Sequence, residues 1–114
     1  MLRIDEGDNG REVSVAAGQW LEICLEENRT TGFRWLVTAA GGPACIPADD
    51  HFEPPGGPAG GSGRHCWRFR AAAPGRGTIT LVYRRSWEGA PEARTFNVSV
   101  RVGAPTTPAM PADG

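Results

Sequence analysis

The sequence lacks both a surplus of charge and any long apolar segment. Twelve basic side chains stand against thirteen acidic ones, which gives a formal net charge of −1 and a pI near 6.1. Proteins that bind nucleic acid neutralise phosphates with a basic surface, so nucleic acid is not an expected partner. No apolar run approaches the roughly 20 residues that cross a bilayer, and residues 1–6 lack an export signal's apolar stretch. We expect no membrane partner and, unless the chain was trimmed or uses another export route, a cytoplasmic protein.

Large aliphatic residues and helix signals are also scarce. Leu, Ile, Val and Phe make up only 20 of 114 residues, below the roughly 20% at which disorder becomes a concern. Disorder also needs a high net charge, which is missing here. Sixteen glycines and ten prolines indicate many turns, and no 3.6-residue pattern runs for two turns without meeting one of them. The composition therefore predicts a turn-rich β domain without a regular helix.

Cysteine is present in an odd number, at Cys24, Cys45 and Cys66. Three cysteines exclude a complete disulfide framework and allow at most one bridge. Spacing alone does not decide whether Cys45 and Cys66 pair. The favoured interpretation is that all three are small, partly buried thiols.

Period-two alternation of apolar and polar residues is the dominant pattern, and it predicts about seven strands. Residues 41–63 contain five prolines among isolated apolar residues, so this segment is predicted to be a long loop outside any sheet. Short strands at this spacing are typical of an immunoglobulin-like antiparallel β-sandwich. Residues 1–103 are the predicted domain, and the Pro-rich residues 104–114 are a predicted disordered tail. The predicted strands cover residues 2–5, 13–18, 21–25, 33–39, 64–71, 78–83 and 95–102.

Candidate catalytic residues are few. His51 stands beside Asp49 and Asp50, and Ser62 follows, which is the residue set of a hydrolase. All four fall in the predicted loop, where no rigid element would hold them in a reactive geometry. We therefore interpret them as surface polar residues and predict that the chain is not an enzyme.

A metal or phosphate site is equally weakly supported. A zinc site can be drawn from Cys45, His51, His65 and Cys66, but no Cys-x-x-Cys or His-x3-His spacing enforces their convergence. The glycine-rich residues 56–63 lack the Gly-Lys-Ser/Thr ending of a phosphate-binding loop. No metal and no cofactor are predicted.

Three loops between predicted strands carry a more specific pattern. Residues 28–33 combine two adjacent threonines with a glycine that can adopt positive φ. Residues 60–63 are nearly free of side chains, so their backbone could approach another surface closely. Residues 85–89 place Trp87 beside an arginine, as in binding hot spots. The alternatives are that Trp87 folds back over the sandwich and that the threonines form a local hydroxyl-to-backbone turn.

In this order the three loops resemble those of the chagasin family of inhibitors of papain-like cysteine proteases. The family motifs read Asn-Pro-Thr-Thr-Gly-Tyr/Phe, then Gly-x-Gly-Gly followed after three residues by an aromatic, then Arg-Pro-Trp. The similarity extends over about residues 9–103. The matching segments here are Asn28-Arg29-Thr30-Thr31-Gly32-Phe33, Gly60-Gly61-Ser62-Gly63 followed by Trp67, and Arg85-Ser86-Trp87.

The resemblance implies an immunoglobulin-like sandwich whose three loops, at one end, fill a protease cleft. The chain would then be a reversible, tight-binding inhibitor, most simply a monomer. Thr30 would lie over the catalytic thiolate of the enzyme, the glycine loop would pair its backbone with the cleft wall, and Trp87 with Arg85 would contact an aromatic rim. The alternative is an immunoglobulin-like binding module that recognises a glycan or a cell-surface protein through the same end.

The sequence departs from the family motif at one position in each loop. Arg29 and Ser86 replace prolines, and Ser62 replaces a glycine. A proline that fixes φ is worth about 0.4 to 1 kcal/mol of preorganisation, so losing two would weaken binding by up to roughly tenfold. We therefore expect a weakened inhibitor with altered specificity.

Overall fold

The computed structural model describes residues 1–55, 62–85 and 92–104, which form a two-sheet β-sandwich. Its two 3-10 helices, η1 (Glu6–Asp8) and η2 (Arg29–Thr31), are single turns. Within the described ranges, no helix has the length and apolar character needed to cross a membrane. The eight strands are β1 (Leu2–Ile4), β2 (Glu12–Ala16), β3 (Trp20–Glu27), β4 (Phe33–Ala40), β5 (Cys45–Glu53), β6 (Gly63–Ala71), β7 (Gly75–Arg85) and β8 (Glu92–Gly103).

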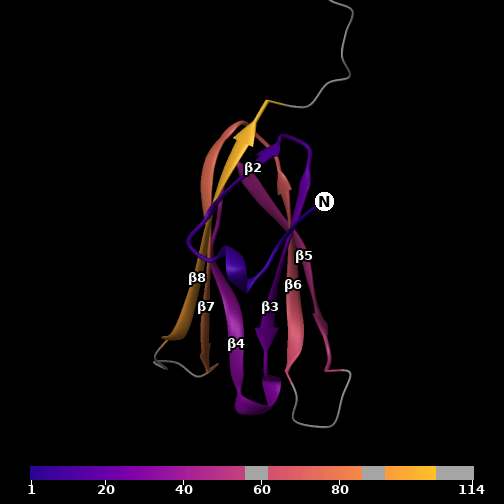
Figure 1. The fold of residues 1–114 in the computed structure, drawn as a ribbon, viewed down its shortest axis with the longest axis vertical. Coiled ribbons are helices and arrows are strands. Elements are labelled where there is room, and N and C mark those ends of the chain that lie inside the picture. The colour runs from indigo at the N-terminus through magenta and orange to yellow at the C-terminus, as the bar shows by residue number, and fades with distance from the viewer. Residues whose placement is uncertain (56–61, 86–91, 105–114) are drawn as a thin grey trace, which may run out of the picture.

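The strands form two four-stranded sheets that face each other (Figure 1). One sheet has the order β1-β3-β6-β5 and the other the order β2-β8-β7-β4. The short pairings β1 with β3 and β2 with β8 are parallel, and the longer pairings are antiparallel. The predicted immunoglobulin-like sandwich is confirmed, with one strand more than expected.

The additional strand is β5, and it corrects the prediction that residues 41–63 lie outside any sheet. β5 pairs with β6 along its whole length, and the register shifts between Pro47 and Asp49. The edge position explains why a strand can contain proline, because the ladder on its open side needs no N–H donor. Most of β5 is exposed on both faces, so the burial alternation that marks a strand in a sequence is missing.

The core lies between the sheets, where the inward rows of alternating residues meet. Leu21, Ile23 and Leu25 of β3 have no exposed surface. They belong to the same core cluster as Ile79 and Leu81 of β7 and the valines of β8. The predicted alternation is also confirmed on β6. There the inward row is buried and the arginines are exposed.

Two cysteines form a disulfide, so the interpretation of three free thiols is wrong. Cys24 and Cys66 stand opposite each other in the register of β3 and β6 and are bonded. Cys45 is free and buried, and its burial raises the pKa of the thiol above the ordinary value. Strand register cannot be read from the spacing of cysteines, so the sequence could not show which two of them lie opposite each other.

Candidate functional site

The strand ends that flank the three predicted loops meet at one end of the sandwich, which we call the loop pole. Glu27 at the end of β3 pairs with Gly63 at the start of β6, and Phe33 at the start of β4 pairs with Arg85 at the end of β7. The end of β5 and the start of β8 lie at the same level of their sheets. Figure 1 shows η2 and these strand ends together at the lower end of the molecule.

The described residues cover part of the predicted site. Residues 28–32 connect β3 to β4, which begins at Phe33. Ser62 precedes β6, which begins at Gly63, and Arg85 ends β7. Four predicted site residues lie outside the described ranges: Gly60, Gly61, Ser86 and Trp87.

The first loop is a compact turn held by its own hydrogen bonds. η2 spans Arg29–Thr31. The Thr31 hydroxyl donates to the Asn28 carbonyl over 2.7 Å, and the Gly32 N–H donates to the Arg29 carbonyl over 3.2 Å. Gly32 has a φ of +82°, in the left-handed region that favours glycine. The predicted positive φ is therefore confirmed, and Thr31 makes the local hydroxyl-to-backbone bond considered as an alternative.

Aromatic residues support the base of this loop. The Asn28 N–H donates to the Tyr83 hydroxyl over 3.1 Å. The Tyr83 ring stacks on Phe33 and packs against Trp35, with centroid separations of 5.2 and 4.8 Å. The indole N–H of Trp35 donates to the Glu26 carbonyl over 2.9 Å. The turn is thus tied to β3, β4 and β7.

The residues of the second and third loops that the structure describes also have roles inside the molecule. A Cβ at Gly63 would lie 2.3 Å from the Glu53 carbonyl oxygen and 2.5 Å from the Phe52 ring, so only glycine fits there. The close backbone approach expected of this glycine is therefore to β5 of the same chain. The Arg85 guanidinium lies 5.0 Å from the centroid of the Phe33 ring, which links the third loop to the first.

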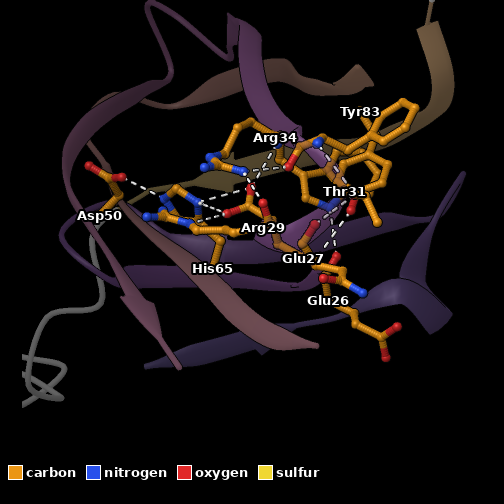
Figure 2. Close-up of polar contacts among 11 residues, drawn as sticks. Glu26, Glu27, Arg29, Thr31, Arg34, Asp50, His65 and Tyr83 are labelled. Atoms are coloured by element: carbon orange, nitrogen blue, oxygen red, sulfur yellow. Dashed lines mark hydrogen bonds and ion pairs between the residues drawn. The ribbon is translucent and has the colours of Figure 1, made fainter. Parts of the chain in front are cut away.

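Glu27 is the polar centre of the loop pole, and its carboxylate is fully buried. One oxygen accepts the Trp35 backbone N–H over 2.8 Å, and the other accepts Nε–H of Arg29 over 2.9 Å (Figure 2). His65 Nδ1 lies 3.2 Å from this second oxygen, and His65 Nε2 lies 2.6 Å from the Asp50 carboxylate. Burying a charge costs free energy unless the charge is paired. Here the Glu27 carboxylate is paired with Arg29 and with His65.

The sequence interpretation missed Glu27, although a signal was present. Glu27 continues the inward row of Leu21, Ile23 and Leu25 at the same spacing of two residues. An acidic residue in a core-facing row indicates a buried ion pair. Its partner His65 lies 38 positions away in the sequence, so the pairing itself depends on the fold.

The residues considered as a hydrolase site and as a zinc site do not come together in the described part of the structure. Asp49 binds Arg68, whose hydrogen bond lowers the pKa of the Asp49 carboxyl, while Asp50 faces His65. His65 faces the core, whereas Cys66, the next residue, lies on the opposite face of β6. Donor atoms of His51, Glu53 and Cys66 do gather within 4.8 Å, but the Cys66 sulfur is already bonded to Cys24.

Comparisons with known proteins agree with the fold. The family model of the chagasin family peptidase inhibitors I42 matches residues 14–100. The chain is 33% identical to amoebiasin-1 of Entamoeba histolytica over 104 residues, which are 89% of this chain and 99% of that protein. It is 30% identical to chagasin of Trypanosoma cruzi over 94 residues, 76% of this chain and 84% of that protein.

Solved structures share the architecture. The cysteine protease inhibitor EhICP2 from Entamoeba histolytica has a TM-score of 0.80 at 21% identity, over 90% of this chain and 95% of that chain. PbICP-C, solved in complex with falcipain-2, has a TM-score of 0.57 at 19% identity, over 90% of this chain and 100% of that chain. The family match and the relatives together establish that this chain belongs to the chagasin family and is a cysteine protease inhibitor, not an enzyme.

Proposed function

We propose that this chain is a reversible, tight-binding inhibitor of papain-like cysteine proteases that occludes the active-site cleft with three loops. The observation that carries the proposal is the loop pole, where the strand ends flanking all three motif segments meet. A fold relative solved in complex with falcipain-2 supports the choice of partner class.

The first loop is proposed to cover the catalytic thiolate. Thr30 occupies the middle of η2, a turn closed by hydrogen bonds to Asn28 and Arg29. Attack by a thiolate requires a carbonyl carbon aligned about 3 to 3.5 Å from the sulfur. A turn fixed in another geometry excludes water and substrate without offering a scissile bond, so inhibition is reversible and the inhibitor stays intact.

The second and third loops are proposed to bind the enzyme on either side of its cleft. Residues 60–62 would add their backbone to the cleft wall, because strand addition needs only main-chain groups, whereas Gly63 is already paired with Glu27 of β3. Trp87 would pack on an aromatic rim with Arg85 alongside it, as expected for an interface anchor. An inhibitor that enters the cleft with these three loops acts as a monomer.

The test is a titration of active papain with the purified protein, with trypsin as a control for protease class. We expect inhibition of papain alone, recovery of full activity on dilution, and an uncleaved inhibitor by mass spectrometry. Thr30→Ala and Trp87→Ala should each weaken inhibition by roughly 10- to 100-fold, the range of interface hot spots. Thr78→Ala, at an exposed position of β7 toward the other end of the sandwich, is the matched control.

The proposal fails if micromolar protein does not inhibit a panel of papain-like enzymes, or if the Thr30 and Trp87 variants inhibit as well as the parent. Binding to a glycan or a cell-surface protein without inhibition of any such enzyme would instead support the binding-module alternative.

A further inference from the structure

We propose that Glu27 is a positioning residue for the first loop: its buried carboxylate holds Arg29 and thereby fixes the turn of residues 28–33. This inference rests on the proposed function, because it assigns the fixed turn to protease binding. In this chain the ion pair takes the place of the proline that the family motif has at position 29.

Both ends of the contact are fixed. The Glu27 side chain is fully buried in the inward row of β3 and is held by the Trp35 backbone N–H of β4 and by His65 of β6. It also accepts from Nε of Arg29, two residues further along the chain and at the first position of η2. The carboxylate therefore has little freedom to follow Arg29 if the turn moves.

Arg29 is held at three further points. Its guanidinium lies 3.9 Å from the centroid of the Phe52 ring of β5, a cation–π contact. Its carbonyl accepts the Gly32 N–H within the turn and, over 3.3 Å, a guanidinium N–H of Arg34 from β4. Figure 2 shows Glu27 and Arg34 next to Arg29 at the start of the turn. Side chain and backbone of Arg29 are thus both anchored.

The burial of Glu27 separates positioning from direct recognition. A side chain with no exposed surface cannot touch an enzyme, so any effect of Glu27 on binding passes through other residues. An apolar residue in this inward row would avoid the desolvation of a charge. The carboxylate is therefore best explained by what it holds, and of the three partners named above Arg29 is the one in the first loop.

Proline and an ion-paired arginine can each restrict the backbone at this position. Proline is favoured at the first residue of a helical turn because its φ is preset and its N–H is not needed there. An arginine tied to a buried carboxylate is restricted by its side chain instead. The loss of affinity expected from Arg29 replacing proline is then offset in the native chain.

The test is a double-mutant cycle on papain inhibition with four proteins: the parent, Glu27→Gln, Arg29→Pro and the double variant. Gln keeps the shape and one acceptor oxygen but removes the charge. We expect Glu27→Gln to weaken inhibition by about tenfold when Arg29 is present, within the range of coupling between contacting residues. In the Arg29→Pro background the same change should alter inhibition less than about twofold, since proline supplies the restriction.

An equal loss in both backgrounds would show that Glu27 acts only through general folding, and no loss in either would show that it has no role. Both results overturn the inference. Arg76→Gln is the matched control, because Arg76 pairs with Glu12 over 3.2 Å near the opposite end of β7. It should leave inhibition unchanged, and thermal unfolding of all variants confirms that each is folded.

A second measurement tests the inference without any protease. Backbone ¹⁵N relaxation of the free proteins reports the order of the Thr31 and Gly32 amides. Order should fall in Glu27→Gln and return in the double variant, where proline restricts the turn. Unchanged order in Glu27→Gln overturns the inference. If the parent fails to inhibit any papain-like enzyme, the proposed function falls and this measurement alone decides the role of Glu27.

Discussion

The two ends of the sandwich are closed by opposite means. At the far pole, away from the loops, the closure is made by small residues whose backbones touch. A Cβ at Gly77 would lie 2.2 Å from the Gly41 carbonyl oxygen, and the Cys45 N–H donates to that same oxygen over 2.9 Å. At the loop pole the closure is made by charged and aromatic side chains around Glu27 and His65.

The difference shows that the two ends contribute different properties, one mainly stability and the other a defined arrangement of side chains. Close contact of small residues excludes water without burying a charge, so the far pole contributes stability at little electrostatic cost. A buried carboxylate adds little net stability even when paired, but it specifies one arrangement of its donors. Mutations at the far pole should therefore change folding, whereas mutations at the loop pole should change inhibition.

The largest effect is expected at the far pole. In Gly77→Ala the new Cβ meets backbone atoms of Gly41, which cannot rotate away, so we expect a loss of about 3 to 5 kcal/mol in the free energy of unfolding. Urea unfolding measures it. Gly103→Ala is the control, because its Cβ would meet nothing closer than 3.8 Å. A changed inhibition constant for folded Gly77→Ala would contradict the independence of the poles.

The next largest effect is expected between the poles, at the disulfide. Cys24 and Cys66 are 42 residues apart, and closing a loop of that length stabilises a protein by about 2 to 4 kcal/mol. The double variant with alanine at both positions should lose this amount in urea unfolding and keep its inhibition constant. A reducing agent should lower the stability of the parent and leave the double variant unchanged. Weaker inhibition by the folded double variant would show that the bridge also shapes the loop pole.

A smaller change in stability, with a change in function, is expected for Tyr83→Phe. Removing the hydroxyl deletes the acceptor of the Asn28 N–H at the base of the first loop. We expect a loss of about 1 kcal/mol in stability and a severalfold weaker inhibition. Thr80→Val is the control, since it removes a comparable hydrogen bond to Asn97 away from the loop pole. Equal inhibition by Tyr83→Phe and the parent would argue that the base of the loop is held by other contacts.

The smallest effect is expected at Asp49, which lies at neither pole. Arg68 lowers the pKa of the Asp49 carboxyl, so the pair stabilises the fold above the unfolded-state pKa of about 4. This contribution is lost as the pH falls through the lowered folded-state pKa. In urea unfolding at pH 7, the parent should have a slightly larger free energy of unfolding than Asp49→Asn. This difference should disappear in strong acid. A difference in stability that grows on acidification would contradict a lowered pKa of the Asp49 carboxyl.

The sequence predicted the parts of the fold that follow from local pattern. Alternation identified the inward rows of β3, β6, β7 and β8, because each of those strands has one buried face. It failed for β5, which is exposed along most of its length and interrupted by Pro47. It also failed for the cysteines, because pairing depends on which strands are neighbours.

The candidate site was predictable only as three motif segments. Their convergence at one pole follows from the register of strands that are distant in the sequence. The network around Glu27 was missed because its parts come from β3, η2, β4, β5 and β6, and no local pattern joins them. Arg29 was interpreted from the sequence as a lost proline, whereas the structure gives its side chain a partner of its own.

The path of the chain at the loop pole has a further consequence. β5 and β6 belong to one sheet and β7 and β8 to the other, but residues 28–32 carry the chain from β3 in the first sheet to β4 in the second. Other connections also pass between the sheets, but at the loop pole the described connection that joins them is this one, so a change in sheet spacing at this end would strain residues 28–32. In the proposed complex, an enzyme with a wider or narrower groove would load the same turn that is proposed to cover its sulfur, so the fit to the groove and the block of the active site would be coupled.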